Sequence, residues 1–284
     1  MLVGPTTRRR RLGADLRRLR EARSLRLDEV AVHLGVAPST LSRIETGKAP
    51  TRTSYLSLML DLYGVTDPAQ RRLLADLARE GQRKGWWADY EDLLPAGSGI
   101  YLGLEADART LRAFGAYLVH DLLQTREYAA AVLAAGRPEL SRSQLERLVD
   151  VRTRRQELLA GDDPVQLTLV LDESALLRSF GSQELMRGQL GHLAEAASRP
   201  AVTVRVLRLA AAGRPAPAGS FAIVGFGTSG DADVLCAEGL RGQLLLAERA
   251  ADVDAMRLMF DALSAAALPP ADSLSLIGEL AAAP

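Results

Sequence analysis

Residues 38–46, PSTLSRIET, carry four polar side chains whose types and spacing suit contact with the edges of base pairs. In a helix, Leu41 and Ile44 face the same side, so the polar side chains face the other side. Arginine is the commonest reader of the guanine O6 and N7 atoms, and small hydroxyl side chains let a helix come close to the bases. The pattern predicts that a helix over Pro38–Thr46 enters the major groove of double-stranded DNA. The candidate base-reading residues are Ser39, Thr40, Ser42 and Arg43.

The residues before this helix have the pattern of another helix and a tight turn. Leu27–Leu34 has apolar residues at helical spacing, and Gly35 follows where the backbone needs a positive φ. Val36 is expected to pack between the two helices, and Pro38 presets the backbone at the first helical position. The first N–H groups of the second helix would point at phosphate. The two segments together predict a helix-turn-helix.

Further amphipathic helices are expected on both sides of this pair. Asp67 and Pro68 are suited to be the N-cap and the first residue of a longer helix that ends near Lys84. The sequence predicts an all-α, five-helix helix-turn-helix domain over residues 11–84, preceded by a disordered basic arm over residues 1–10. The breaks between the helices are expected at Ser24, Gly35, Gly47–Pro50 and Gly64.

The charges of the 284 residues cancel over the whole chain but not within its parts. Residues 1–84 contain 17 Lys and Arg against 9 Asp and Glu, whereas residues 85–284 contain 18 against 26. A basic N-terminal part suits a polyanion, and an acidic C-terminal part suits a protein or a small molecule. The single cysteine excludes an internal disulfide and fits a cytoplasmic protein. We expect neither a signal peptide nor a membrane span, because no apolar run is long enough.

The motif Ser-Thr-Leu-Ser-Arg-Ile-Glu, with Gly47 two positions on, resembles the phage-repressor-like helix-turn-helix family, also called the xenobiotic-response-element family. The resemblance covers about residues 11–65 and implies a DNA-binding fold. It also implies a partly buried ion pair between Arg20 and Glu45 that braces the recognition helix. The family usually has Ser or Thr at the position of Arg26, and loss of that N-cap is expected to cost the helix about 1 kcal/mol.

Four basic residues are candidates for binding phosphate. The same resemblance implies that Lys48 and Arg52 flank the recognition helix and bind the DNA backbone. Arg10 and Arg11 belong to the basic run at the N-terminus, for which two interpretations stay open. The run is either a solvated tail or an arm that reaches phosphates or the minor groove.

The pattern changes at Gly85, after which helices are expected first and strands appear from Pro164. Residues 95–103 are expected to form a connection, and the whole region 85–284 a mixed α/β domain, so that the fold class is α+β overall. Strands are predicted over Val165–Leu171, Val202–Leu207, Ser220–Phe226 and Asp233–Cys236. Helices are predicted over Glu105–Tyr117, Thr125–Ala135, Ser141–Ala160, Ser182–Ala197, Ala250–Leu268 and Ser273–Ala281.

Several segments of this region, among them GWWADY (85–90), LLQTREYAAAVL (122–133) and GSFAIVGF (219–226), resemble a second family. It is the domain of unknown function that follows the helix-turn-helix in many regulators of high-GC Gram-positive bacteria. Those regulators are often described as antitoxin-like, and their genes often lie beside a gene for a small protein. The family usually has Pro-Gly where this chain has His120 and Asp121, which puts a turn-forming role of these residues in doubt.

The C-terminal region has no recognisable catalytic constellation. The motifs HExxH, CxxC and GxSxG do not occur, so we expect no enzyme activity, metal or cofactor. Residues 225–230 match GxGxxG, but a strand rather than a helix is predicted to follow, which indicates a β-hairpin turn. Trp86, Trp87 and Tyr90 either contact a ligand or partner, or fasten the linker to the second domain.

We therefore expect a sequence-specific transcriptional regulator. Its C-terminal domain would bind a small partner protein, encoded by a neighbouring gene, or a ligand. A homodimer is expected because one short recognition helix gives little specificity, and two half-sites multiply it. Two alternatives stay open: an antitoxin that represses its own operon, and a metabolite-gated repressor.

Overall fold

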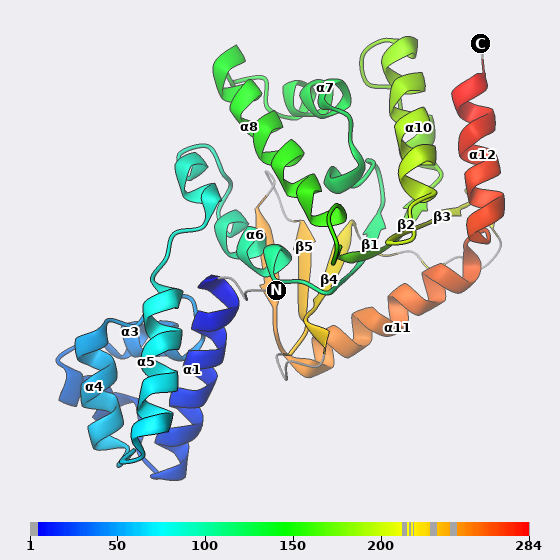
Figure 1. Ribbon diagram of the computed structural model, residues 1–284. Helices are drawn as coiled ribbons and strands as arrows, with labels where there is room; N and C mark the ends of the chain where they lie inside the picture. Colours follow the sequence, from blue (N-terminus) through cyan, green and yellow to red (C-terminus); the bar gives the residue numbers. More distant parts are fainter. Residues whose placement is uncertain are drawn as a thin grey trace. The chain divides into compact units, whose positions relative to one another are not determined.

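Five α-helices in the first part of the chain enclose an apolar core (Figure 1). The computed structural model describes residues 5–211, 215, 217, 219–227, 232–238 and 243–283. The chain divides into two compact units, residues 1–88 and 89–284. The helices of the first unit are α1 (Pro5–Ala22), α2 (Leu27–Leu34), α3 (Pro38–Glu45), α4 (Thr53–Leu62) and α5 (Pro68–Gly81). The largest fully buried side chains of its core are Leu12, Leu16, Leu41, Ile44, Leu56, Met59 and Tyr63.

The start of α1 corrects the prediction of a disordered arm for residues 5–10, and residues 1–4 of that arm lie outside the described residues. Residues from Pro5 onward are helical, and Thr6 and Thr7 are buried. Arg8 forms an ion pair with Glu80 at 2.7 Å, which anchors the first turns of α1 to the end of α5. The fold supplies partners for two arginines of the basic run, because Arg9 also donates hydrogen bonds to the carbonyls of Gly81 and Arg83.

The second unit is built on a six-stranded mixed sheet in the order β3-β2-β1-β4-β5-β6. Strand β1 pairs in parallel with β2, and β2 with β3, whereas β1–β4, β4–β5 and β5–β6 are antiparallel. With the helical first unit, this sheet confirms the predicted α+β fold class. The strands are β1 (Thr110–Gly115), β2 (Gln166–Asp172), β3 (Val202–Leu207), β4 (Phe221–Gly225), β5 (Val234–Glu238) and β6 (Leu244–Ala247).

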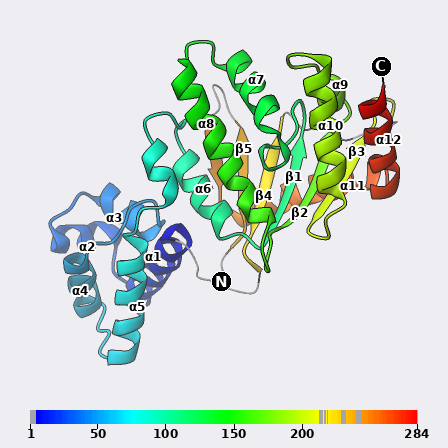
Figure 2. The same cartoon turned by 45° about the horizontal axis from the view of Figure 1, so that its top comes forward.

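The two faces of the sheet are covered unequally (Figures 1 and 2). Helices α6, α7, α8 and α10 lie on one face, and α12 packs against α10 and β3. Helix α11 crosses the other face and buries Phe260 and Leu263 against it. No helix in the described parts of the chain is long and apolar enough to cross a membrane. The α-helices are α6 (Ser98–Ala106), α7 (Arg126–Gly136), α8 (Arg142–Arg155), α9 (Ser174–Leu177), α10 (Gln183–Ala197), α11 (Ala250–Ala266) and α12 (Pro270–Ala282).

The segment 95–117 was predicted wrongly. Helix α6 occupies Ser98–Ala106, where a connection was expected, and β1 occupies Thr110–Gly115, where a helix was expected. In β1 the buried Leu111 and Ala113 alternate with exposed residues, which is the period of a strand. The run has few β-branched residues, so its strand conformation depends on pairing with β2 and β4 rather than on local propensity.

Strands β4 and β5 form the antiparallel pair that the hairpin interpretation of residues 225–230 requires, with Phe221 opposite Ala237. Residues 228–230 themselves lie outside the described residues. Strand β6 was not predicted, because its four residues Leu244–Ala247 are too short to show a period.

A buried ionic cluster joins α6, α8 and the loop after β1. Arg155 donates two hydrogen bonds to Glu105, at 2.7 and 2.8 Å, and a third to Asp121 at 2.7 Å. The side chain of Glu105 is completely buried, and that of Arg155 is 9% exposed. Burial alone would raise the pKa of Asp121, but the charges of Arg152 and Arg155 outweigh it and lower that pKa to about 2. Asp121 therefore stays ionised and holds the loop in place.

Removal of Glu105 should destabilise the second unit strongly. Glu105→Ala leaves the Arg155 guanidinium buried with only one carboxylate, and loss of one partner of a buried pair typically costs about 3 kcal/mol of the free energy of unfolding. The matched control is Asp92→Ala, which removes a two-oxygen pair with Arg147 that lies at the surface. That change should cost far less. Urea unfolding of both variants measures the difference, and equal losses would contradict the importance of the buried pair.

Candidate nucleic-acid interface

Helix α3 presents the residues that the sequence proposes as base readers. The buried side chains of Leu41 and Ile44 anchor it to the core. The helix ends at Glu45, one residue before the predicted end at Thr46, which is the C-cap. The hydroxyl of Thr46 donates a hydrogen bond to the Ser42 carbonyl at 2.8 Å. The structure places Ser39, Ser42 and Arg43 on the exposed side of α3, with Thr40 half-buried beside them.

The turn before α3 has the geometry that the sequence requires. Gly35 has φ +66°, a conformation that a residue with a Cβ rarely adopts. The N–H of Val36 donates to the carbonyl of Ala31 at 3.0 Å, and the Val36 side chain packs against the core. Pro38 is at the start of α3. The helix pair is therefore held at a defined angle by local contacts.

The N-terminus of α2 compensates in part for the unusual Arg26. The Arg26 side chain cannot accept a hydrogen bond, and it donates instead to both carboxylate oxygens of Asp28, at 3.1 and 2.8 Å. The carboxylate of Glu29 accepts from the Arg26 N–H at 2.7 Å, which is one half of a capping box. Asp28 and Glu29 also place negative charge in the first turn, where the helix dipole favours it.

The structure brings Arg20 and Glu45 together. Arg20 Nε and one terminal nitrogen donate to the two Glu45 oxygens at 2.7 and 2.9 Å, and the other terminal nitrogen donates to the Leu25 carbonyl at 2.9 Å. The side chain of Glu45 is only 3% exposed. The Arg20 guanidinium thus joins the end of α3 to α1 and to the turn before α2.

Helix α1 also comes unusually close to the backbone at the end of α3, a feature that the sequence analysis missed. A Cβ at Gly13 would lie 2.5 Å from the carbonyl oxygens of both Ile44 and Glu45. A Cβ at Gly47, which has φ +68°, would lie 2.7 Å from the backbone of Arg10. Two glycines at facing positions of α1 and the turn after α3 are the signal that could have revealed the contact.

The basic residues around α3 differ from most others in the first unit. Many of the other arginines form ion pairs, such as Arg17 with Glu21, Arg18 with Asp15 and Arg79 with Asp76. Arg10 is half-buried at Gly47, so its position serves packing as well. Arg52 stacks over the ring of Tyr55 at 5.8 Å. Some exposed cations near α3 and on α1 form no ion pair among the described residues. They are Arg11, Arg43, Lys48 and Arg52.

The aromatic residues near the linker divide between the two units. Trp86 and Trp87 belong to the first unit, where their rings meet edge to face with 5.8 Å between the centroids, and Trp87 is buried. Tyr90 belongs to the second unit, where the Arg147 guanidinium lies over its ring at 5.6 Å. All three lie in or at the end of the 3-10 helix η1 (Trp86–Tyr90). A ligand contact by these rings remains a prediction.

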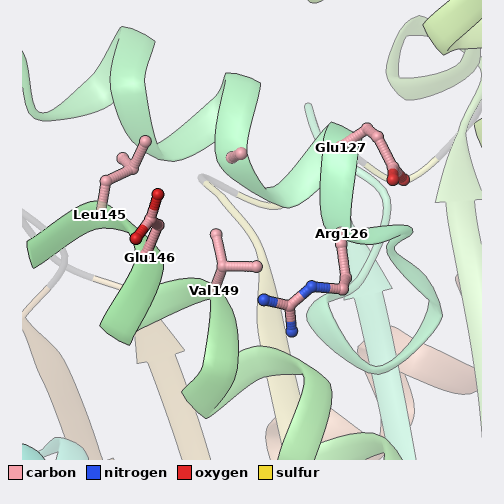
Figure 3. Close-up of a pocket in the computed structure, with 6 residues that line it drawn as sticks. Arg126, Glu127, Leu145, Glu146 and Val149 are labelled. Carbon is pink, nitrogen blue, oxygen red and sulfur yellow. The ribbon is translucent and has the colours of Figure 1, made fainter. Parts of the chain in front are cut away.

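A shallow groove of about 240 Å³ lies between α7 and α8 in the second unit (Figure 3). Its apolar lining includes Leu145 and Val149 of α8, and the charged side chains at its rim include Arg126 and Glu127 of α7. Arg126 reaches across to Asp150 at 2.8 Å and so ties the two helices together. Sequence reasoning did not identify this groove, because it forms only when two helices pack side by side.

The five-helix fold, the exposed α3 and the match of residues 11–74 to a helix-turn-helix domain family define a DNA-binding regulator of the helix-turn-helix class. Residues 100–279, more than half of the chain, match a domain of unknown function (DUF5753), and the chain belongs to this family. No curated protein and no solved structure matches the chain.

The close approach of Gly13 to the end of α3 predicts that a substitution on α1 weakens DNA binding. In Gly13→Ala the new methyl group pushes α3 away from its position, which should lower DNA affinity about tenfold and reduce the free energy of unfolding by about 2 kcal/mol. The matched control is Gly191→Ala in α10, where a Cβ meets no atom within 4 Å. That change should leave DNA binding intact and stabilise the helix by up to about 1 kcal/mol. Unchanged DNA affinity in Gly13→Ala would show that α3 tolerates displacement.

Proposed function

We propose that the protein is a sequence-specific transcriptional regulator in which α3 reads an operator from the major groove. The observation that supports this best is the exposed position of Arg43 on α3, next to small polar side chains. Arg43 has no ion-pair partner among the described residues. An arginine in that setting is able to donate two hydrogen bonds to guanine. Ser39, Thr40 and Ser42 are short enough to let the helix approach the base edges.

Contacts to phosphate are assigned to the cations that surround α3. Lys48 and Arg52 follow α3 in the chain and are exposed, and Arg11 is exposed on α1. Contacts of this kind contribute affinity without sequence preference and make binding depend on salt. Arg10 stays in the proposal as a weaker candidate, because part of its side chain is used in packing against Gly47.

Arg43→Ala and Lys48→Ala should affect DNA binding in different ways. A selection from a random duplex library with the full chain first defines a preferred site. Arg43→Ala should bind that site at least tenfold more weakly and lose its preference over unrelated duplexes, because a base contact is removed. Lys48→Ala should weaken binding to all duplexes alike and make the salt dependence shallower by about one ion. Arg79→Ala, which removes an ion pair on α5, is the control, and full sequence preference in Arg43→Ala would refute the assignment.

For the second unit we propose a role as an interaction domain that receives a signal and supplies dimer contacts. Its excess of acidic residues does not suit DNA, and the groove between α7 and α8 offers an apolar floor with charged rims to a side chain of a partner. The partner proposed is a small protein encoded by a neighbouring gene or a ligand. Antitoxin activity and metabolite gating are two forms of this same proposal, and they differ in which partner is captured.

The dimer proposal predicts the form of the selected DNA sites. A two-fold symmetric protein should select inverted half-sites separated by about one helical turn, or a multiple of it. Sedimentation should give the mass of two chains per site. Single, unpaired half-sites together with a monomeric mass, both free and on DNA, would contradict the homodimer. Pull-down of the tagged chain from its own cells, analysed in parallel, identifies the protein partner if there is one.

A further inference from the structure

The first turns of α1 lie between the recognition helix and the segment that leads out of the first unit. On one side, Arg10 and Gly13 contact Gly47 and the last carbonyls of α3. On the other side, Arg9 Nε donates to the carbonyl of Gly81, the last residue of α5, and a terminal nitrogen of Arg9 donates to the carbonyl of Arg83 at 3.3 Å. Consecutive residues of one helix thus hold both the end of α3 and the start of the linker.

A second contact connects the same two regions without passing through α1. The side-chain amide of Gln82, the C-cap of α5, donates to the carbonyl of Thr51 at 2.9 Å. Thr51 is 3% exposed and follows the turn after α3. The N–H of Ala49, in that turn, donates back to the carbonyl of Arg43 at 3.1 Å. Two independent routes therefore connect the end of the recognition helix to the linker: one through the packing of α1 and the hydrogen bonds of Arg9, and one through the hydrogen bonds of Gln82 and Ala49.

We propose, on the basis of the function proposed above, that Arg9 and Gln82 are positioning residues for DNA reading. They couple the conformation of the linker residues 81–84 to the position of the C-terminal end of α3. Neither residue needs to touch DNA for this. Both use side-chain donors on main-chain carbonyls, so a shift of the linker changes the anchorage of α1 and of the turn after α3 directly.

The arrangement gives the second unit a physical route to the recognition helix. The linker continues from Arg83 to Trp86 and Trp87 and then enters the second unit at Asp89. A signal bound there that pulls on the linker changes the hydrogen bonds of Arg9 and Gln82. Because such coupling is reciprocal, DNA bound at α3 must also change the environment of the linker.

The chain carries its own reporter for this test, because Trp86 and Trp87 are its only tryptophans. Addition of the duplex recovered by the selection to the full chain should change the tryptophan emission. In Arg9→Ala and in Gln82→Glu, which loses the amide donor, the emission change should fall by more than half and DNA affinity by about tenfold. Arg72→Ala, which loses only a hydrogen bond to Pro68 within α5, is the matched control and should alter neither signal.

Arg9→Lys distinguishes positioning from direct DNA contact. It keeps the charge but not the two-bond fork, so it should behave like Arg9→Ala. If Arg9→Lys restores affinity, and Arg9→Ala makes the salt dependence shallower by about one ion, Arg9 is a phosphate ligand and the proposal is overturned. DNA binding by the parent chain without any change of tryptophan emission overturns it as well.

Hydrogen exchange in the absence of DNA tests the coupling even if the selection recovers no preferred duplex. Failure of the proposed DNA-reading function can therefore be distinguished from failure of the coupling. Arg9→Ala and Gln82→Glu should speed exchange at the amides of Thr46, Gly47 and Ala49, while the amides of α2 and the turn at Val65 keep their protection. Uniform acceleration throughout the first unit would show that the two residues contribute only to stability, and unchanged exchange would show that they do not hold the end of α3; either result overturns the proposal.

Discussion

The buried pair between Arg20 and Glu45 is the interaction on which the first unit depends most. Glu45 ends α3, so the position of its carboxylate determines the direction of the recognition helix. A buried pair gains little net stability, because removing two charges from water offsets most of their attraction. Its value here lies in geometry, because the planar guanidinium binds both carboxylate oxygens of Glu45 and the Leu25 carbonyl at the same time. A helix held in this way presents the same side chains to every site that it meets.

The second unit uses the same device for a different purpose. Arg155 and Glu105 form a buried two-oxygen pair that joins α8 to α6, with Asp121 as a third member. The chain contains 33 arginines and only two lysines, Lys48 and Lys84. Arginine suits buried pairing because its fork matches a carboxylate and its charge is weakly hydrated. The high arginine content therefore supplies both the surface cations of the first unit and the buried ion pairs of both units.

The fold of the first unit pairs some of its cations with carboxylates and leaves others exposed. Pairs such as Arg8 with Glu80 and Arg79 with Asp76 neutralise cations of α1 and α5. The exposed cations beside α3, among them Arg43 and Lys48, have no such partner in the described structure. These cations add a positive field beside α3, which attracts a polyanion to this helix. The second unit, with its opposite charge, adds no competing attraction for DNA.

The helix-turn-helix is predictable from the amino-acid sequence alone, because its signals are local. Gly35, Pro38 and the spacing of Leu41 and Ile44 act within a few residues of one another, and so does the Asp67 cap of α5. The strands β2 and β3 were equally predictable from their β-branched alternation. Tertiary contacts, in contrast, make residues 5–10 helical and Thr110–Gly115 a strand, and they bring Gly13 against α3 and Arg9 against the linker. Each of these depends on a partner tens of residues away in the chain, and no local pattern records the charge or the backbone that a distant segment supplies.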